Sequence, residues 1–448
     1  MAKEKTKDNL MEKVVSLCKR RGFVFPGSEI YGGLANTYDY GPLGVELKNN
    51  LKRAWWKKFV LDRPDILGLD GGIILNPKIW EASGHTQNFI DVLIECKSCH
   101  KRFRTDFLKE KSKCPECQGI LAEPKKFVPM FKTFIGPAED TSSVAYLRPE
   151  TAQAIFANFK NVIDSFHPDL PFGIAQIGKA FRNEITMGNF IFRNLEFEQM
   201  EIEYFVRPEQ WQEQFSLWQE AMLEWYLSLG IKKENLRWRE HAQDELSHYS
   251  KKTLDLEYNF PFGGFKELCG LAYRTDYDLK NHSQKSGQDL SYADVGQKDR
   301  FFPHVVEPSF GLERALLAML LEAYTEDKDR LVLRLSPEIA PYKVAVFPLL
   351  ANKPDLVKKA RQVFDLLRPN FHTAWDDRGN IGKRYYSQDE IGTVLGVTCD
   401  FQTMEDNTIT VRHRDTMQQI RIPISTLKQT VQGVLDGEEF SGLGELVK

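Results

Sequence analysis

The sequence lacks a long apolar run and an excess of charge of either sign. No stretch approaches the roughly 18 apolar residues that a membrane-spanning helix needs, and residues 1–13 are charged, without the apolar segment of a secretory signal. The 60 basic residues are balanced by 63 acidic ones, for a net charge of −3, so a general basic coat for nucleic acid is excluded. We therefore expect a cytoplasmic protein that has neither membrane nor DNA as a partner.

The common nucleotide-binding loops are also missing. No GxxxxGK[ST] occurs, and the nearest segment, residues 379–384, has the wrong spacing and no hydroxyl after its lysine. No GxGxxG follows an expected strand. If the protein binds ATP, side chains on a sheet must therefore hold the phosphates.

Cysteine is scarce, and its spacing is specific. The seven cysteines are an odd number for a disulfide scaffold, but four of them form two close pairs: Cys96, Cys99, Cys114 and Cys117. In a reducing compartment such C-x2-C pairs indicate a metal site. The four thiolates predict a closed, structural Zn²⁺ site. We interpret His100 as a surface residue, and Cys18, Cys269 and Cys399 as buried or incidental thiols.

The chain length of 448 residues suits two or three domains, and 42% hydrophobic with 27% charged residues is typical of a globular protein. Two helices are predicted by apolar stripes, one over 43–59 and one over 209–229. The first stripe is Leu43, Leu47, Leu51, Trp55 and Phe59. The second contains Trp211, Phe215, Trp218, Met222 and Trp225 and indicates core packing.

Strands are expected on either side of a turn at Met187-Gly188-Asn189 within 172–206, and again at 264–278 and 303–309, before a helix at 310–324. After a proline-containing hinge at 336–341, a strand at 343–348 and a helix at 354–367 begin an alternating pattern. Alternation of this kind predicts a small α/β domain with a mixed or parallel sheet.

The segment 196–206 combines one apolar and one polar face. Because strand residues alternate, Met200, Ile202, Tyr204 and Val206 share a face and should pack inward. The opposite face carries Phe197, Gln199, Glu201 and Glu203, and Arg182 and Glu184 share a face of the preceding segment. An arginine fork suits phosphate, a glutamate suits an exocyclic amine, and an aromatic ring suits a purine. A ligand-binding floor is predicted, with a solvated charged hairpin as the alternative.

Three segments resemble the motifs of class II aminoacyl-tRNA synthetases. Residues 181–184, Arg193 and residues 196–201 resemble motif 2, and residues 309–314 resemble motif 3. The helix at 43–59 with Asn76-Pro77 resembles motif 1, which in the family builds the dimer interface. The HIGH and KMSKS signatures of class I synthetases are absent. The resemblance covers nearly the whole chain, and the three motifs occur in the family's order.

Further strings resemble the glycine-specific subgroup of this family: residues 21–26, 38–44, 81–85, 147–153 and 307–309. One departure is Gly392-Thr-Val-Leu-Gly396, where the family pattern is Gly-Thr-Pro followed by an aromatic residue. The resemblance implies a glycine–tRNA ligase that forms glycyl-adenylate from glycine and ATP and transfers the glycyl group to tRNA(Gly).

The resemblance also implies a nucleotide site. Arg182 should hold the α-phosphate, Glu184 should read the adenine amine, and Phe197 and Arg314 should sandwich the adenine. Glu267 and Glu307 are the expected carboxylates for Mg²⁺ and the ATP side, with Leu268 beside the nucleotide; Arg182, Arg314 and Glu307 are the catalytic set. The remaining expected ATP contacts are Asn183, Phe192, Arg193 and Gly311.

For glycine, Glu150, Glu201 and Glu307 are candidates for the ammonium, with Ser309 as an added acceptor, and Arg274 or Arg104 should meet the carboxylate. Phe197, Gln199 and Gly311 complete the expected glycine pocket. Strand parity puts Glu267 and Arg274 on opposite faces unless the strand is bulged, and Gly270 is a plausible bulge position.

The predicted architecture is an α+β class II catalytic domain over 1–338, with an antiparallel sheet and a zinc-ribbon insertion at 92–130, followed by an α/β anticodon-binding domain over 341–448. The 376–378 and 381–385 segments carry the residue types that grip single-stranded bases, with solvated loops as the alternative. A homodimer is implied, whose interface helix should expose apolar groups that a monomer cannot cover.

Three other classes of protein remain open from the sequence alone. One is a class II paralogue that binds RNA or a partner without catalysis, although both motif arginines, Arg182 and Arg314, are present. Another is a zinc-ribbon nucleic-acid-binding protein, which leaves the 196–206 face unexplained. The third is a class II synthetase for a different amino acid.

Overall fold

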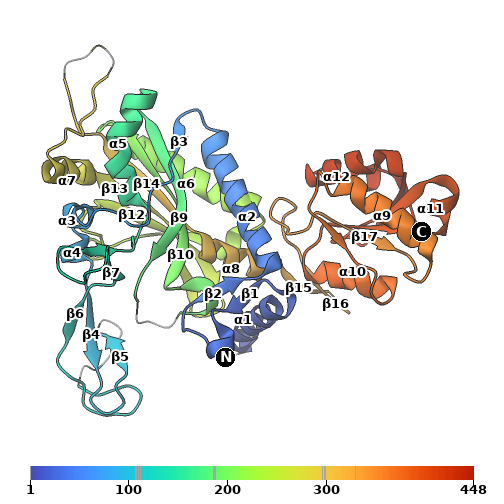
Figure 1. Cartoon of the computed structure of the whole chain (residues 1–448), viewed down its shortest axis with the longest axis horizontal. Helices are drawn as coiled ribbons and strands as arrows, with labels where there is room; N and C mark the ends of the chain where they lie inside the picture. Colours follow the sequence, from blue (N-terminus) through green and yellow to red (C-terminus); the bar gives the residue numbers. More distant parts are fainter. Residues whose placement is uncertain are drawn as a thin grey trace.

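The computed structural model describes residues 2–105, 108, 110, 112–184, 188–294, 296, 299–327 and 329–447. A large body built on one sheet, an arm that projects from it and a smaller C-terminal body can be followed in Figure 1. Met187 of the predicted turn lies outside the described residues, as do residues 106, 107, 109 and 111 of the arm.

The large body is organised by a seven-stranded sheet with the order β11-β12-β13-β14-β10-β9-β3. Neighbouring strands are antiparallel except β3 and β9, which are parallel. The predicted antiparallel α+β fold is therefore confirmed. The strands are β3 (Ile66–Gly68), β9 (Phe172–Phe181), β10 (Glu196–Val206), β11 (Leu236–Glu240), β12 (Lys252–Phe260), β13 (Gly264–Thr275) and β14 (His304–Gly311).

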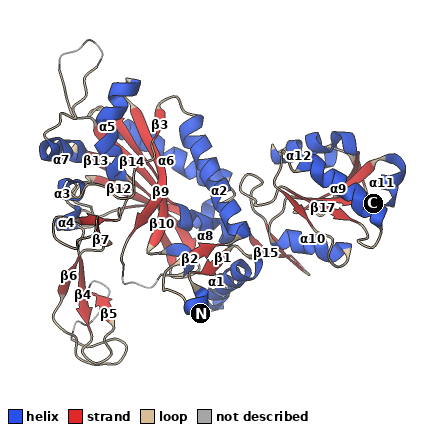
Figure 2. Cartoon of the chain, viewed as in Figure 1, coloured by secondary structure: helices blue, strands red, loops and turns tan. Residues whose placement is uncertain are grey.

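Helices cover both faces of this sheet, as Figure 2 shows. On one face α2 (Pro42–Trp56), α6 (Trp211–Ser228) and α8 (Leu312–Ala323) pack on the apolar side of β10, where Met200, Ile202 and Tyr204 join the main core. On the other face α5 (Ala152–Phe166) and α7 (Tyr277–Ser286) contribute to a second cluster with Phe205 of β10. The predicted inward face of β10 and the core role of α6 are thus confirmed.

The apolar stripe of the first predicted helix is used inside this chain. Leu43, Leu47, Leu51 and Trp55 lie on α2, and Phe59 lies in a π-helical segment, Lys57–Leu61, that continues it; all five are buried in the main core. The helix is confirmed. The stripe itself is not the exposed apolar face that we expected of a dimer helix, because the chain's own sheet and α6 cover it.

Smaller elements complete the N-terminal part of the chain. The arm is a three-stranded sheet of β5 (Arg102–Arg104), β4 (Asp91–Glu95) and β6 (Lys125–Phe127). Two-stranded sheets pair β1 (Val24–Pro26) with β2 (Tyr38–Tyr40) and β7 (Lys132–Phe134) with β8 (Val144–Tyr146). The remaining helices are α1 (Ala2–Arg21), α3 (Lys78–Ala82) and α4 (His85–Asn88). None of the described helices is long and apolar enough to cross a bilayer.

The C-terminal body has a six-stranded mixed sheet with the order β18-β17-β19-β20-β21-β22, parallel at β18/β17/β19 and antiparallel beyond. Its strands are β17 (Val344–Pro348), β18 (Thr373–Trp375), β19 (Leu395–Cys399), β20 (Thr408–His413), β21 (Gln419–Pro423) and β22 (Glu445–Leu446). Its helices are α9 (Pro354–Leu367), α10 (Ile381–Glu390), α11 (Phe401–Asp406) and α12 (Leu427–Leu435). The mixed α/β sheet is as predicted.

A hairpin of β15 (Tyr324–Asp327) and β16 (Arg330–Leu333) lies between the two bodies. Arg330 of this hairpin donates to Asp389 of α10 at 2.6 Å, and Arg414 donates to the carbonyl of Leu335 at 2.8 Å. Both arginines are buried, so these contacts fix the C-terminal body to the hairpin and to the segment that follows it.

Candidate active site

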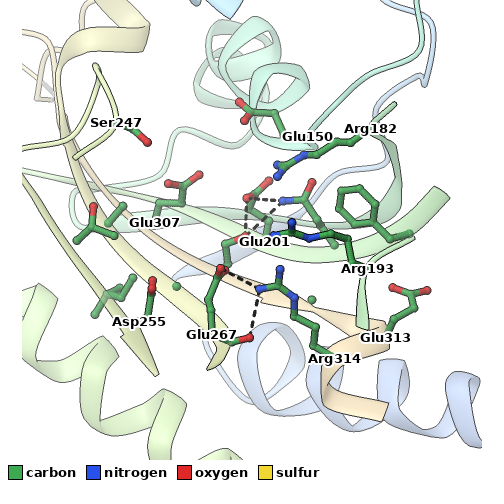
Figure 3. A pocket seen from close by; sticks show the side chains of 18 of the residues that line it. Glu150, Arg182, Arg193, Glu201, Ser247, Asp255, Glu267, Glu307, Glu313 and Arg314 are labelled. Atoms are coloured by element: carbon green, nitrogen blue, oxygen red, sulfur yellow. Dashed lines mark hydrogen bonds and ion pairs between the residues drawn. The ribbon is translucent and has the colours of Figure 1, made fainter. Parts of the chain in front are cut away.

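A cavity of about 270 Å³ opens on the α5 side of the central sheet, where β10, β13 and β14 lie side by side. Helix α5 starts at Ala152 and packs on the first residues of β9, at Phe172 and Ile174, and near the end of β10, at Phe205. The opposite ends of these two strands therefore stay open to a ligand. Figure 3 shows the side chains that converge there.

Strand β10 supplies the floor that its alternation predicts. Phe197, Gln199 and Glu201 line the cavity, whereas Glu203, on the same face, does not and is completely buried. The solvated-hairpin alternative is therefore wrong, because only Glu196, at the start of the strand, is exposed.

One half of the cavity is basic and aromatic. The Arg182 guanidinium lies 5.3 Å from the centre of the Phe197 ring, and its Nε donates to the carbonyl of Pro149 at 3.0 Å. The Arg314 guanidinium lies 4.7 Å from the centre of the Phe192 ring. Both arginines are thus held over aromatic rings, and among the described residues part of each fork has no partner and can meet an anion.

Two glutamates balance the arginines of this half. Arg193 Nε lies 3.2 Å from Glu184 Oε2, and Arg314 Nη1 lies 2.9 Å from Glu267 Oε2. The charge of Arg314 lowers the pKa of Glu267, so this carboxylate is ionised at neutral pH. Figure 3 shows the Arg314–Glu267 pair across the cavity from Arg182 and Glu150.

The other half of the cavity is acidic. Glu201 accepts hydrogen bonds from Thr151, from Ser309 at 2.8 Å and from Gln199 at 3.2 Å. Burial and the nearby Glu150 carboxylate raise the pKa of Glu201, although the hydrogen bonds from Thr151 and Ser309 oppose the shift. The buried site therefore favours a cationic ligand, since a positive charge would offset the unfavourable burial of the carboxylate.

Glu150 precedes α5 and has the opposite shift. Burial by itself would raise the pKa of Glu150, but His85, whose Nε2 lies 3.2 Å away, and Arg274 outweigh it and lower the pKa. Gln153 also donates to Glu150 at 3.0 Å. Glu150 is therefore a fixed negative charge on the acidic side of the cavity.

Glu307 lines the cavity, but Arg274 lies behind it. The Arg274 fork donates to both carboxylate oxygens of Asp278, at 2.8 and 2.9 Å, and to Glu307 at 2.7 Å. Its guanidinium lies 3.8 Å from the centre of the Tyr249 ring, which does line the cavity. Arg274 is therefore used within the protein and does not line the cavity as a contact for a ligand carboxylate.

Strand β13 is bulged, at positions other than the expected one. Leu256 and Glu257 pair with Cys269 and Glu267, so Leu268 is the extra residue, and a second irregularity facing β14 leaves Arg274 as an extra residue. Gly270 pairs regularly with Asp255 and Ser309, so its prediction as the bulge is wrong. The bulge at Leu268 brings Glu267 to the face of Gly270 and Ala272, which line the cavity with it.

Four residues that were expected in the site do not line the cavity. The Leu268 side chain is buried in the main core, because the bulge turns it away from the ligand face. Asn183 lines a neighbouring groove beside the arm, where Lys97, Lys125 and Lys126 also lie. Arg104 belongs to the arm and lies 3.2 Å from Asp91. Arg274 is the fourth, for the reason given above.

The other predicted ligand contacts do line the cavity: Arg182, Glu184, Phe192, Arg193, Phe197, Glu267, Gly311 and Arg314 on the basic side, and Glu150, Gln199, Glu201, Glu307 and Ser309 on the acidic side. Sequence reasoning missed a group that comes from β12 and the loop before it: His241, Ser247, Tyr249, Thr253 and Asp255. No local pattern marks them, because their place depends on how this loop folds over the sheet. Thr151, in contrast, lies inside the segment 147–153 that carried the resemblance.

The four cysteine sulfurs of the arm form one cluster. All four Sγ atoms lie within 4.8 Å of one another, with 3.5 Å between Cys96 and Cys117 and 3.7 Å between Cys99 and Cys114. A zinc tetrahedron with Zn–S bonds of about 2.3 Å has S–S edges of about 3.8 Å, so this set fits the ion. His100 is exposed and lies 3.4 Å from Glu95, as expected of a surface residue. The thiols of Cys18, Cys269 and Cys399 are buried.

The segments expected to grip single-stranded bases divide into exposed and buried residues. Arg384 is buried and donates to the carbonyls of Pro348, Asp377, Arg378 and Gly379, so it stabilises the loop and is not free to bind RNA. The Tyr385 hydroxyl pairs with Thr398. Arg378 and Lys383 are exposed and remain candidates.

Comparison with known proteins defines the class of this cavity. Residues 134–324 match the tRNA synthetase class II core domain (G, H, P, S and T), and residues 343–433 match the anticodon binding domain. The chain therefore contains the core of a class II tRNA synthetase, the class that the β10 and β14–α8 segments resemble.

Curated relatives narrow this class. A glycine–tRNA ligase of Thermobifida fusca (strain YX) is 52% identical over 459 residues, which cover 96% of this chain and 99% of the relative. Those of Streptomyces coelicolor and Alkaliphilus oremlandii are 52% and 51% identical, and cover 93% and 95% of this chain and 97% and 98% of their own lengths. The chain belongs to the glycine–tRNA ligase family.

Proposed function

We propose that the cavity is where glycine reacts with ATP and where the glycyl group passes to the 3′ end of tRNA(Gly), for use in protein synthesis. In the first step a glycine carboxylate oxygen attacks the α-phosphorus, the bond from that phosphorus to pyrophosphate breaks, and glycyl-adenylate forms. In the second step a ribose hydroxyl of tRNA attacks the glycyl carbonyl carbon, and AMP leaves. The observation that carries the proposal is that one cavity has an arginine-rich, aromatic half and, directly beside it, a small acidic half.

The basic half suits ATP. Phosphoryl transfer needs positioning and charge neutralisation more than an acid or base. We assign Arg182 to the α-phosphate, because its partly free fork lies next to the acidic half. Glu184 accepts from the adenine amine, and Phe197 and Arg314 hold the adenine plane between them, with Phe192, Arg193 and Gly311 around it.

Magnesium is the cation that usually accompanies ATP, and here it would add positive charge at the phosphates. Glu267 is the carboxylate best placed to receive it, because its side chain is 49% exposed at the rim of the cavity. Glu307 is less suited to bind a metal, since its side chain is buried. We therefore assign Mg²⁺ to Glu267 and keep Glu307 for the amino acid.

The acidic half suits an amino acid that has an ammonium group and almost no side chain. Glu150, Glu201 and Glu307 surround the position, and Ser309 and Gln199 already brace Glu201. Arg274 acts through Glu307, which it orients. Because Arg274 and Arg104 do not line the cavity, we assign the glycine carboxylate to the side of Arg182, where it would also face the α-phosphate.

Other parts of the chain have supporting roles. Cys96, Cys99, Cys114 and Cys117 would hold a structural Zn²⁺ that stabilises the arm. The part from 341 to 448 would bind the anticodon, after a catalytic part over 1–338 with the insertion at 92–130. The chain would act as a cytoplasmic homodimer without DNA as a partner. The buried stripe of α2 cannot supply the dimer contact, so other residues would form it.

The Arg182→Ala variant tests the assignment of the phosphate grip. Loss of a donor that meets developing charge should lower kcat for glycine-dependent ATP–pyrophosphate exchange at least ~100-fold. Circular dichroism and the melting temperature should stay close to wild type, because the Arg182 side chain, just beyond the end of β9, makes one hydrogen bond within the described residues and otherwise lies over aromatic rings. Exchange within a few-fold of wild type would refute the role.

A further inference from the structure

Beneath the acidic half lies a carboxyl group to which the reaction gives no role. Glu203 is 0% exposed, and neither of its carboxylate oxygens has a hydrogen-bond partner among the described residues. It lies on the same face of β10 as Glu201. The pairs Glu201–Ser309 and Tyr204–Val306 set the β10–β14 register, which places Glu203 across from Glu307.

The three carboxyl groups are close. One carboxylate oxygen from each of Glu201, Glu203 and Glu307 lies within 4.8 Å of the others. Three ionised groups at this separation would repel strongly in a site from which water is excluded. Glu201 is relieved by donors from Thr151, Ser309 and Gln199, and Glu307 is relieved by Arg274, but Glu203 has no such donor.

The charged groups facing this cluster come from five elements, β10, β13, β14, α4 and α7, and from the segment before α5, and they do not balance. Besides the three glutamates of β10 and β14, Asp278 comes from α7 and Glu150 precedes α5. Against these five acids stand Arg274 of β13, which is bonded to Glu307 and Asp278, and His85 of α4, which lies beside Glu150. The buried Arg148 also lies near Glu201, but it donates to backbone carbonyls and to none of the five acids. His282 of α7 faces the neutral Gln153. This excess of acids favours a protonated carboxyl in the cluster unless a cation is added.

A buried ionised carboxylate without a donor is far more costly than a neutral one. Burial raises the pKa of both Glu203 and Glu307 well above the ordinary value, and the charge of Arg274 opposes both shifts, but Arg274 donates a hydrogen bond to Glu307 and none to Glu203. Among the clustered acids, Glu203 is the one without hydrogen-bond donors in the described part of the chain, so we expect it to keep its proton.

We propose that Glu203 is a positioning residue that remains a neutral carboxylic acid beneath the glycine site. It fills the space behind Glu201 and Glu307 without adding a third charge, so that both carboxylates can be directed at the ammonium. The role toward glycine rests on the proposed function, whereas the protonation of Glu203 does not.

The Glu203→Gln variant tests the protonation, because glutamine imitates the neutral acid. The unfolded wild-type chain releases this proton near a pKa of about 4.3, whereas the folded chain keeps it to higher pH. Between these two values the folded state binds the extra proton, so the free energy of unfolding falls as pH rises. In E203Q this contribution is lost. The number of protons exchanged on unfolding in urea, between about pH 5 and pH 8, should therefore differ from that of wild type by about one. E203Q should therefore gain stability relative to wild type as pH rises.

Glu198 offers a matched control on the same strand. It is also buried, but Lys48 and Lys52 lie at 2.8 and 3.1 Å. Burial opposes these lysines, yet they lower the pKa of Glu198, so its contribution is present above the unfolded pKa and is lost as pH falls. E198Q should therefore lose stability relative to wild type, most of all near neutral pH, which is the opposite direction to E203Q.

The experiment also separates the alternatives. Glycine-dependent exchange by E203Q should keep a KM for glycine within about threefold of wild type. If E203Q loses stability near neutral pH as E198Q does, Glu203 is ionised and the proposal is overturned. If a chelator lowers the melting temperature of wild type but not of E203Q, in a background with the arm cysteines replaced, the cluster holds a metal ion and the proposal is also overturned. If wild type shows no glycine-dependent exchange while the stability data hold, the proposed function fails and the protonation stands.

Discussion

Arg314 and Glu267 meet at the rim of the cavity through two contacts. Arg314 Nη1 lies 2.9 Å from Glu267 Oε2 and donates to the Glu267 carbonyl at 3.2 Å. Arg314 stands at the start of α8, and Glu267 is held at the rim by the bulge at Leu268. The pair therefore fixes the arginine over the half of the cavity that we propose for the nucleotide.

Replacing Arg314 tests this placement. Arg314→Ala should raise the KM for ATP and lower kcat/KM for exchange by about 100-fold or more, since both the stacking plane and the charge are lost. Arg314→Lys is the matched control: it keeps the charge but loses the planar fork, and should recover only part of the loss. Full activity of the lysine variant would show that the planar group is not needed.

Gly270 offers a steric test of the cavity. A Cβ added there would meet only Asp255 Oδ1, at 3.9 Å, so a side chain would point into open space that we assign to the ligand. Gly270→Val should fold normally but lose at least ~10-fold in kcat/KM for exchange, because its methyl groups occupy that space. Gly442→Val, at a glycine with no atom near the added Cβ, is the control. Unchanged KM values for both substrates in Gly270→Val would contradict the assignment.

How much of this site could be predicted depended on whether local pattern or long-range folding fixes each residue. The alternation of residues 196–206 sufficed to predict a floor of Phe197, Gln199 and Glu201, since strand geometry alone sets the face. The bulge at Leu268 could not be located, because an inserted residue changes the face of everything beyond it and leaves no composition signal. The fold class followed from alternating β and α segments and from the three motifs.

Charge was the least predictable property. Arg274 and Arg384 both look like ligand-binding arginines in the sequence, yet both are buried and used by the protein itself, Arg274 by Asp278 and Glu307 and Arg384 by backbone carbonyls. Tyr249 and His241 reach the cavity from the loop between β11 and β12, a position that no local pattern encodes. Tertiary packing therefore decided which charges remain available to a ligand.

The arm should contain one metal ion per chain. Protein purified without chelator should carry about one equivalent of zinc by elemental analysis, because four thiolates in this arrangement form a closed tetrahedral site. The Cys114→Ser variant should lose the metal, whereas Cys399→Ser, at a buried thiol in the C-terminal sheet, should keep it. Metal-free wild-type protein would refute the site.

The C-terminal body can be tested in the full chain. Arg378 is 87% exposed, and Lys383 is exposed nearby on α10. The Arg378→Ala/Lys383→Ala double variant should raise the KM for tRNA by about tenfold, since two cationic contacts to RNA are lost. Glycine-dependent exchange, which needs no tRNA, should be unchanged. Equal charging of tRNA by variant and wild type would exclude this surface from the RNA interface.

The central claim concerns how glycine is selected. Glycine has no smaller analogue, so every competitor is too large, and crowding by Glu150, Glu201, Glu307 and Ser309 can reject alanine at its methyl group. Overpacking a tight site costs about 1–3 kcal/mol or more, and displacement of the ammonium from its carboxylates adds to this cost. No separate editing site is then required.

The most direct measurement is ATP–pyrophosphate exchange by the wild-type protein with glycine and with alanine, beside the Glu201→Asp variant. We predict rapid exchange with glycine, little with alanine, no hydrolysis of alanyl-tRNA, and for Glu201→Asp both weaker glycine activation and a narrower margin over alanine. Efficient activation of alanine by the wild-type protein, or hydrolysis of alanyl-tRNA after transfer, would contradict selection by the walls of this cavity.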